Sequence, residues 1–338
     1  MPATNVSWPV PLQRLNPWYP GQAGGVPGTD SETGLRLNTE GTIFWVDPNH
    51  PDPHDSRDGT NPTSPLATVE AAIAKCEAYR GDVIAVMHNG YWTYGDPAAD
   101  NFTPIQETVT IDVPGVRLVG ISPSPMGVPW VGSANNDTLI SVTALDVIIE
   151  GFNFWEPTYT GVTAIESLWN GPPYGENLTV RHCFFYDVAY GIQLDYSWYC
   201  VIEDCRFDSV GTAAIHNPSV YGEPDYLVIK NCIFAENTAD INLPDTDEVI
   251  IEGCRFMDVT AAITMTSGDN NQIIGNVIQG AGAGVNNMIN LTTGGNNVVT
   301  DNTLTCTIAQ YDTCCSDTNS GSWGFNHCGN GDTTAAPT

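Results

Sequence analysis

An eight-residue pattern of apolar and polar positions recurs along the chain from residue 147 onward. Its first copy spans residues 147–154, and six further copies begin at Leu178, Cys200, Leu227, Val249, Asn271 and Asn297. The third position is Ile or Val in every copy, and the eighth is Phe in five copies and then Ile278 and Leu304. Cys183 and Cys205 are 22 residues apart. Self-similarity at a period of about 20–50 residues indicates a solenoid.

Each repeat is too short to bury its own apolar side, so neighbouring repeats must stack to build a core. Parallel strands stack about 4.8 Å apart, which aligns equivalent residues of successive coils in columns. A second apolar column, with one residue per coil, contains Ile165, Ile192, Ile215, Ile241, Ile263 and Ile289. The pattern predicts an all-β chain that folds as a right-handed parallel β-helix.

The sixth position of the repeat predicts a structural ladder at a tight bend. After Phe152 in the first copy, the later copies hold small side chains there: Cys183, Cys205, Cys232, Cys254, Asn276 and Asn302. The cysteine spacing differs from zinc motifs, in which paired ligands stand two to four residues apart. We expect these four thiols to be buried, reduced and stacked along the rod.

The segments outside the repeats suggest four parts. Residues 1–42 are rich in proline and predict an extended arm. Residues 43–100 predict an N-terminal cap, with a strand over 43–46, a helix that carries Leu66, Val69, Ala72, Ile73 and Cys76, and a strand over 82–87. Residues 101–305 form the predicted β-helix, and residues 306–338 a cysteine-rich tail. Four tail cysteines are candidates for disulfides of open connectivity, for a link to a neighbour or, less favoured, for a metal site: Cys306, Cys314, Cys315 and Cys328.

These features together resemble a known family. The helix followed by Gly81-Asp82-Val83-Ile84-Ala85-Val86 and Gly90-Tyr91, and then coils with a Cys or Asn turn ladder, is similar to the pectin-lyase-like right-handed β-helix superfamily over residues 43–304. In character it is closest to phage tail-spike and decoration proteins. The resemblance implies that the first helix caps the open end of the rod. It leaves the activity open, because this fold hosts lyases, hydrolases, adhesins and tail spikes.

Charge narrows the range of partners. The 39 acidic and 10 basic residues give a net charge of -29, which repels polyanions. Nucleic acid, anionic membranes and polyuronates are therefore disfavoured. The N-terminus lacks the pattern of a secretory signal, and no run of residues is long and apolar enough to insert in a membrane. We expect a location on a virion, or outside the cell after lysis, since viral proteins need no export signal.

The sequence offers no clear catalytic set. Polyuronate lyases need a basic residue, but the fourth repeat position alternates in charge, so its bases have acidic neighbours: Glu150, Arg181, Glu203, Lys230 and Glu252. Asp195, Asp204, Asp208 and Asp225 are conceivable glycosidase carboxylates, although a solvated surface is the favoured interpretation of each. A cation site at Asp47, Asp52, Asp55 and Asp58, with His50 and His54, is less favoured than a self-capped loop. We therefore expect no catalytic residue, no metal and no cofactor.

Two sets of residues are candidates for contact with partners. Aromatic side chains between the coils either stack on carbohydrate, pack against a partner or pack on the rod itself: Trp169, Tyr174, Tyr196, Trp198 and Tyr221. The second repeat position should face outward, yet it is mostly apolar. This interface stripe consists of Ile148, Val201, Val228 and Ile250, and it should be covered by loops, the arm or another subunit.

The leading hypothesis is a non-enzymatic virion protein, such as a capsid decoration, spike or fibre. We expect a homotrimer whose N-terminal arm contacts other virion proteins, with host glycans as a further candidate partner. The first alternative is a polysaccharide lyase or glycoside hydrolase, for example a depolymerising tail spike. The second is a host carbohydrate-binding adhesin.

Overall fold

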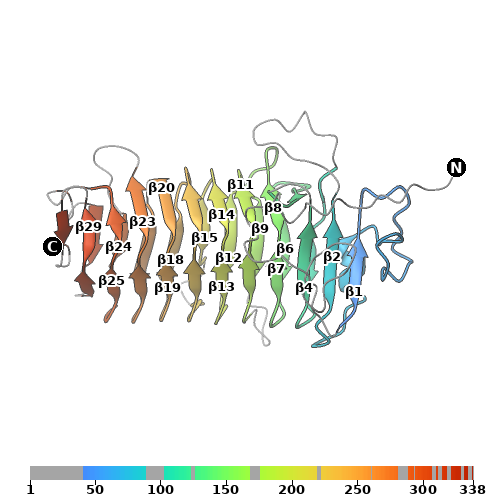
Figure 1. The fold of residues 1–338 in the computed structure, drawn as a ribbon, viewed down its shortest axis with the longest axis horizontal. Helices are drawn as coiled ribbons and strands as arrows, with labels where there is room; N and C mark the ends of the chain where they lie inside the picture. The colour runs from blue at the N-terminus through green and yellow to red at the C-terminus, as the bar shows by residue number, and fades with distance from the viewer. Residues whose placement is uncertain are drawn as a thin grey trace, which may run out of the picture.

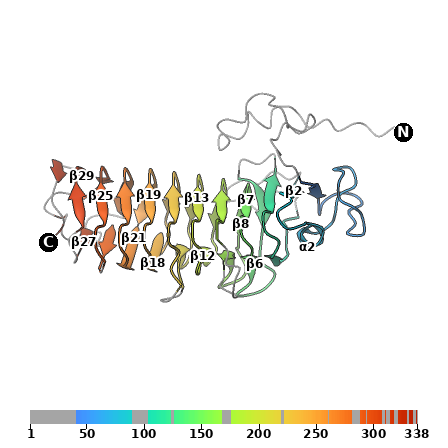
Figure 2. The same cartoon turned by 90° about the horizontal axis from the view of Figure 1, so that it is seen from below.

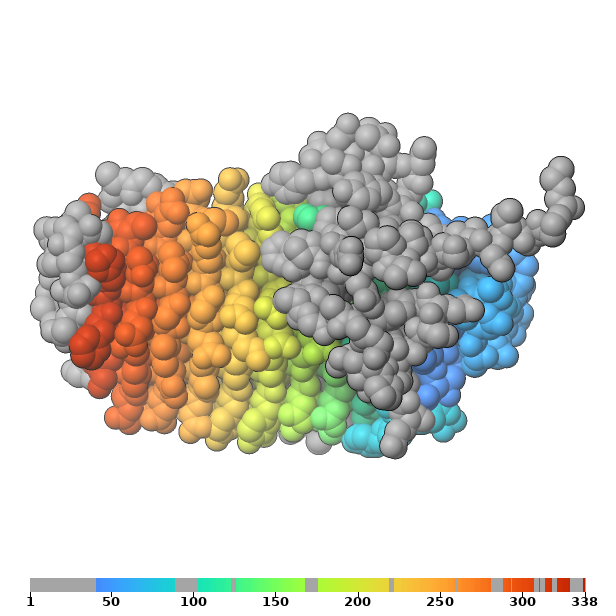
Figure 3. All heavy atoms as spheres, viewed as in Figure 1, coloured from blue at the N-terminus to red at the C-terminus, as the bar shows by residue number. Residues whose placement is uncertain are grey.

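The chain forms a rod of three parallel β-sheets (Figures 1 and 2). The structure, a computed structural model, describes residues 41–88, 103–122, 126–167, 176–218, 222–259, 261–280, 288–292, 294–306, 310, 314–317, 321–328, 331–333 and 337. The coils follow one another in sequence order along the long axis (Figure 3). The predicted parallel β-helix is confirmed.

Sheet A has eleven strands, and its order follows the sequence: β1 (Ile43–Val46), β2 (Val83–Met87), β4 (Arg117–Ile121), β7 (Ile148–Glu150), β10 (Thr179–Arg181), β13 (Val201–Glu203), β16 (Val228–Lys230), β19 (Ile250–Glu252), β22 (Gln272–Ile274), β25 (Val298–Thr300) and β28 (Ser322–Gly324). Each strand of this sheet begins a coil.

Sheet B has ten strands: β5 (Val128–Trp130), β8 (Phe152–Trp155), β11 (Phe184–Tyr186), β14 (Arg206–Asp208), β17 (Ile233–Ala235), β20 (Arg255–Val259), β23 (Val277–Gly280), β26 (Thr303–Leu304), β29 (Asn326–Cys328) and β30 (Gly331–Thr333). Only β30 runs antiparallel to its neighbour, β29. Sheet C has nine: β3 (Val109–Ile111), β6 (Thr138–Val142), β9 (Thr163–Ser167), β12 (Tyr190–Leu194), β15 (Ala213–His216), β18 (Ile241–Asp245), β21 (Ile263–Ser267), β24 (Ile289–Leu291) and β27 (Cys315–Asp317).

The core consists of columns of like residues. Phe185, Phe207 and Phe234 face each other in register on β11, β14 and β17. Their ring centroids are 4.6 and 5.0 Å apart, and the ring planes are nearly parallel. Phe154 and Phe256 extend the stack at 5.1 and 4.7 Å. In-register pairing thus converts a sequence repeat into a continuous dry core.

The turn between sheets A and B contains the predicted ladder. Cys183, Cys205, Cys232 and Cys254 are buried free thiols, and the Cys205 Sγ donates to the Glu203 carbonyl at 3.3 Å. From Asn276 onward amides replace the thiols. The Asn302 Oδ1 accepts the Asn276 N–H at 2.9 Å, and its Nδ2 donates to the Ile273 carbonyl at 2.9 Å. Each side chain therefore satisfies backbone groups that the bend leaves unpaired.

The rod includes strands on both sides of residues 101–305. At the N-terminal end, β1 pairs with β2 and β2 pairs with β4, so both are strands of sheet A. At the C-terminal end, β27, β28 and β29 add one strand to each sheet. The division of the chain into four parts stays a prediction. Residues 321–328 are an eighth copy of the repeat that the pattern search missed, because Trp323 stands in place of Ile or Val and Cys328 in place of Phe.

The helix α2 is short and spans Val69–Ile73 (Figure 2). Thr68 is its N-cap, since the Thr68 Oγ1 accepts the Ala71 N–H at 3.2 Å. Leu66, which was predicted to lie on the helix, instead forms a parallel bridge with Val46. The helix packs on β1, β2 and β3, and its capping of the rod stays a prediction. The arm over residues 1–40 and the Gly90-Tyr91 turn lie outside the described residues.

Candidate functional site

The outward face of sheet C carries an unbroken polar row. Alternate residues of a strand face opposite sides, so the residue after each core isoleucine points away from the core. These residues are paired in register across the sheet and are all half-buried: Ser141, Glu166, Gln193, His216, Asn242, Thr264, Asn290 and Ser316. We call this set the polar row. It presents hydroxyl, amide, carboxyl and imidazole groups at intervals of about 4.8 Å.

Contacts between coils hold members of the polar row in place. The Thr138 Oγ1 donates to the Glu166 Oε2 at 3.0 Å, and the Ser316 Oγ donates to the Asn290 Oδ1 at 2.5 Å. The Tyr190 ring stacks on the His216 imidazole with centroids 5.7 Å apart. The row is therefore preorganised, with an aromatic ring beside it.

Burial shifts the titration of two members of the row. It raises the pKa of Glu166, and the charge of the nearby Asp195 adds to this shift. Burial also lowers the pKa of His216. At neutral pH the imidazole is therefore uncharged, so one ring nitrogen donates and the other accepts.

The loops from sheet C to sheet A carry aromatic and acidic residues. Tyr196 and Trp198 are half-buried in the loop after β12, and the Tyr196 N–H donates to the Gly222 carbonyl at 3.3 Å. Trp169, Tyr174 and Tyr221 lie outside the described residues. Two of the five predicted contact residues therefore lie in the loop that follows β12, the strand of Gln193.

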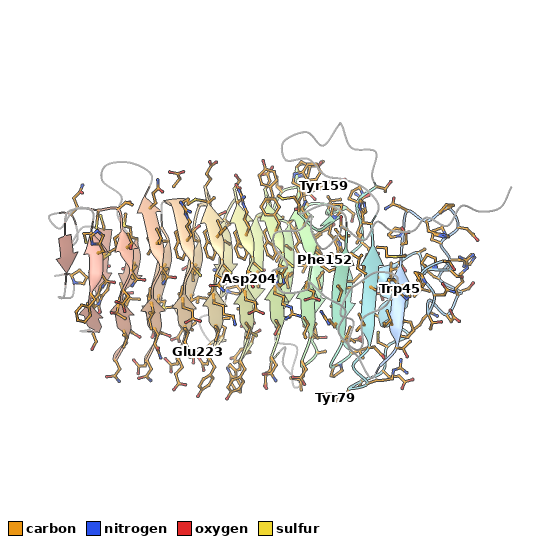
Figure 4. The ribbon with its side chains drawn as sticks, viewed as in Figure 1. Trp45, Tyr79, Phe152, Tyr159, Asp204 and Glu223 are labelled. Carbon is orange, nitrogen blue, oxygen red and sulfur yellow. The ribbon has the colours of Figure 1, made fainter. Side chains whose placement is uncertain are left out.

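Glu223, in the loop before β16, and Asp245, the last residue of β18, form a carboxyl pair. Burial, followed by the charge of Asp245 and a hydrogen bond with it, raises the pKa of Glu223 to about 7. Figure 4 shows Glu223 near the lower edge of the rod. A carboxyl that keeps its proton near neutral pH is able to act as a hydrogen-bond donor or a general acid.

The four aspartates considered as catalytic pairs are not brought together. Asp195 and Asp225 lie in the loops from sheet C to sheet A. Asp204 lies in the turn between sheets A and B (Figure 4), where its Oδ2 is 3.7 Å from the His182 Nε2. Asp208 is buried in β14 and accepts from Arg206 at 2.6 Å.

The bases at the fourth repeat position are held by glutamates on the outward face of sheet A. The buried Glu150 binds both Arg117 and Arg181, the latter with an Nε–Oε2 distance of 2.5 Å. Lys230 lies 2.8 Å from Glu203. Arg117 stands opposite Ile148, at the second position of its coil, so it does not belong to the fourth-position column.

The acidic N-terminal loop forms internal caps. The Asp47 Oδ1 accepts the Asn49 N–H at 3.0 Å, and the Asp55 Oδ1 accepts the Ala67 and Thr68 N–H groups at 2.8 and 3.0 Å. Asp52 pairs with Arg57. No group of His, Cys, Asp and Glu within the described ranges is arranged to hold a metal ion.

The chain also resembles known proteins. A family model described as the right-handed β-helix region matches residues 171–324. An alginate lyase from Paenibacillus sp. str. FPU-7 is 15% identical over 78% of this chain and 93% of the lyase, with a TM-score of 0.50. The pectate lyase Pel9A is 13% identical over 86% of this chain and 78% of the lyase, with a TM-score of 0.53.

The chain has a right-handed parallel β-helix fold, as these two lyases do. ORF18 of Geobacillus virus E2 also matches, with 13% identity over 84% of this chain and 62% of that chain and a TM-score of 0.47. No curated protein matches the chain in sequence. At such identities, the likeness to the two lyases shows the fold alone.

The interface stripe of this β-helix lies in register on β7, β13, β16 and β19, with Thr179 of β10 between the first two members. Its members are half-buried: Ile148, Val201, Val228 and Ile250. A buried apolar cluster that includes Trp45, Ala85 and Val119 lies on the strands β1, β2 and β4. The stripe therefore keeps apolar surface in contact with solvent along the middle of the rod.

Four tail cysteines of the β-helix are buried: Cys306, Cys314, Cys315 and Cys328. The Cys306 Sγ lies 3.7 Å from the Cys328 Sγ, whereas a disulfide bond is about 2.05 Å long. The disulfides, the link to a neighbour and the metal site considered from the sequence stay predictions. No helix among the described residues is long and apolar enough to cross a membrane.

The sequence reasoning missed the polar row, although a signal was present. The residue after each isoleucine of the second column is polar in every coil of this β-helix: Glu166, Gln193, His216, Asn242, Thr264 and Asn290. A polar residue after each isoleucine of the second column predicts a continuous polar face.

Proposed function

We propose that this β-helix is a non-enzymatic protein of a virion surface that binds glycans through the outward face of sheet C. The polar row carries the proposal. Saccharides offer hydroxyl groups that both donate and accept hydrogen bonds, and the row presents Gln193, His216 and Asn242 as matching neighbours on three successive strands. Tyr190 beside them offers an aromatic surface for a sugar ring.

The ion pairs of Arg181 and Lys230 favour binding of a ligand without cleavage. Arg181 and Lys230 are engaged by glutamates at 2.5 and 2.8 Å, and a base held in an ion pair stays protonated. The net charge of -29 also opposes binding of a polyuronate. These features favour a ligand without carboxylates and a role in adhesion.

The test is a glycan array with wild type and a Gln193→Ala/Asn242→Ala variant. We expect the variant to lose about 5- to 150-fold in affinity, since two hydrogen bonds worth about 0.5–1.5 kcal/mol each are removed. Gln272→Ala is the matched control, because Gln272 is an exposed amide on the outward face of sheet A. Equal binding by the double variant and the control would exclude the polar row as the site.

The same proposal includes a homotrimer that uses the interface stripe. Half-exposed Val201 and Val228 supply apolar surface on adjacent strands. In a Val201→Asp/Val228→Asp variant, like charges would enter a dry contact and dissociate the oligomer. Light scattering measures the mass, and a monomer in both proteins would exclude the trimer. Mass spectrometry of purified virus particles tests the virion location, and absence of the chain from particles would contradict it.

A second candidate function is a depolymerising glycoside hydrolase, because Glu223 has a pKa of about 7 beside Asp245. Such enzymes use a protonated carboxyl as the general acid, and burial together with Asp245 raises the pKa of Glu223 into the range that this role needs. New reducing ends from a polysaccharide, abolished by Glu223→Gln, would favour this candidate over simple binding.

A further inference from the structure

In successive coils, a residue shortly before the sheet A strand has a left-handed backbone, and these residues form a column along the rod. From Tyr79 to Asn270, the N–H of each member of the column donates to a carbonyl in the next coil. Most members are Gly, Asn or Asp, which tolerate this conformation, whereas a bulky side chain there is uncommon. The column contains Tyr79, Gly115, Asp146, Asn177, Tyr199, Tyr226, Glu248, Asn270 and Asn296.

Two adjacent coils place tyrosine in this column and expose the rings. Tyr199 and Tyr226 have φ values of 59° and 56°. Their rings stack with centroids 4.7 Å apart at an interplanar angle of 11°. They remain 51% and 42% exposed, so burial of the rings in the core does not account for the unfavourable backbone. A strained residue that the fold does not need is a candidate for binding.

The stacked pair leaves aromatic surface available. On the side of the preceding coil, Asn177 turns away, because its Nδ2 donates to the Asp146 Oδ1 at 2.9 Å. On the following coil, Glu248 lies beside Tyr226 and hydrogen-bonds with it. The pair is thus an exposed aromatic surface next to a carboxylate.

A line of carboxylates runs beside the pair. The Asp225 Oδ1 accepts the Asp247 N–H at 2.9 Å, and the Asp247 Oδ1 accepts the Asp269 N–H at 2.6 Å. These hydrogen bonds fix the aspartates in a row along the rod. The field of Asp225, Asp247 and Glu248 repels an anion and attracts a cation.

We propose that Tyr199 and Tyr226 form a stacking platform for an amino sugar. The sugar ring packs on the aromatic surface, and its ammonium group lies beside Asp225, Asp247 and Glu248. This inference rests on the proposed glycan binding and adds a subsite and a ligand class to it. It predicts that the protein prefers cationic to anionic saccharides, whereas a polyuronate-binding protein prefers anionic ones.

The test is calorimetric titration of the full chain with a glucosamine hexamer, its N-acetylated counterpart and a galacturonate hexamer. We expect affinity to fall in that order, with no measurable binding of galacturonate. A Tyr199→Asn/Tyr226→Asn variant should lose at least tenfold in affinity for the glucosamine hexamer. Its melting temperature should be unchanged or higher, because asparagine suits the left-handed backbone.

Tyr79→Asn is the matched control. Tyr79 belongs to the same column, with a φ of 57°, and is 66% exposed, but the next member is Gly115, so it has no stacked tyrosine there. We expect this variant to bind as wild type does. Equal binding by the double variant and wild type would overturn the platform, and a preference for galacturonate would overturn the charge argument.

Failure of this inference can be told apart from failure of the proposed function. If Gln193→Ala/Asn242→Ala weakens binding of the glucosamine hexamer and Tyr199→Asn/Tyr226→Asn does not, the platform is wrong and glycan binding stands. If wild type binds no saccharide on the array or in the calorimeter, both are wrong.

Discussion

Phe207→Ala perturbs the stacked core at its centre. Phe207 is completely buried, and its ring stacks on Phe185 at 4.6 Å and on Phe234 at 5.0 Å. It also fills the space left by Gly191, since a Cβ there would lie 2.9 Å from the Phe207 Cδ1. Alanine would therefore leave a cavity between two aromatic rings.

The expected loss of stability follows from this geometry. Truncation of a buried Phe to Ala costs about 3–5 kcal/mol, and each stacked pair contributes about 0.5–1.5 kcal/mol beyond its burial. Phe185 and Phe234 cannot both close the cavity, because each also stacks on its outer neighbour, at 5.1 and 4.7 Å. We therefore expect a loss near the upper end, about 4–5 kcal/mol.

Urea unfolding followed by circular dichroism and by tryptophan fluorescence measures this loss. Both signals should shift to lower urea with an unchanged slope if the rod unfolds in one step. Phe325→Ala is the control, since Phe325 is 73% exposed and its removal should change the midpoint little. A Phe207→Ala midpoint equal to that of wild type would refute the stacked column.

Three further substitutions test other parts of the structure. Asn302→Ala leaves the Asn276 N–H and the Ile273 carbonyl without their buried partner and should lower the free energy of unfolding in urea by about 2–4 kcal/mol. Asn302→Cys places in the ladder the residue type found at Cys254 and should cost less. Equal losses for the two variants would refute the hydrogen-bonding role. Glu150→Ala removes the buried acceptor of Arg117 and Arg181 and should lower the free energy of unfolding by about 2 kcal/mol. This loss is smaller than that for a fully buried pair, because the arginines are partly exposed. An unchanged unfolding midpoint would contradict this prediction. The pKa of Glu223 rises from 4.5 to about 7 on folding, so the folded state binds more protons than the unfolded state between these pH values. The contribution of Glu223 to stability therefore falls as pH rises through this window. Glu223→Gln should raise the melting temperature at pH 8 more than at pH 4.5, and an equal change at both would contradict the shift.

Periodic residues made the fold predictable. The third repeat position is Ile or Val in all seven recognised copies and the eighth is Phe in five of them, and in-register pairing then fixes which residues meet. The coil at residues 321–328 was missed because Trp323 fills the core where Ile or Val stands elsewhere. At the other end, β2 was recognised as a strand, but its pairing with β4 depends on contacts between segments that do not share the repeat.

The candidate site was harder to predict, because its residues belong to columns that differ in chemistry from coil to coil. Glu166, Gln193 and His216 share a position on sheet C but no motif. The left-handed backbone of Tyr199 and Tyr226 and the stacking of their rings appear only in three dimensions. The role of Trp169, Tyr174 and Tyr221 in contacting a carbohydrate or a partner stays a prediction.

The most direct test of glycan binding without cleavage measures binding and the length of the oligosaccharide in the same sample. The full chain is titrated with the glucosamine hexamer in a calorimeter, and the oligosaccharide is recovered after a day and its length determined by mass spectrometry. We expect saturable heat and an intact hexamer. Absence of heat, or recovery of shortened oligosaccharides, would contradict a non-enzymatic glycan-binding β-helix.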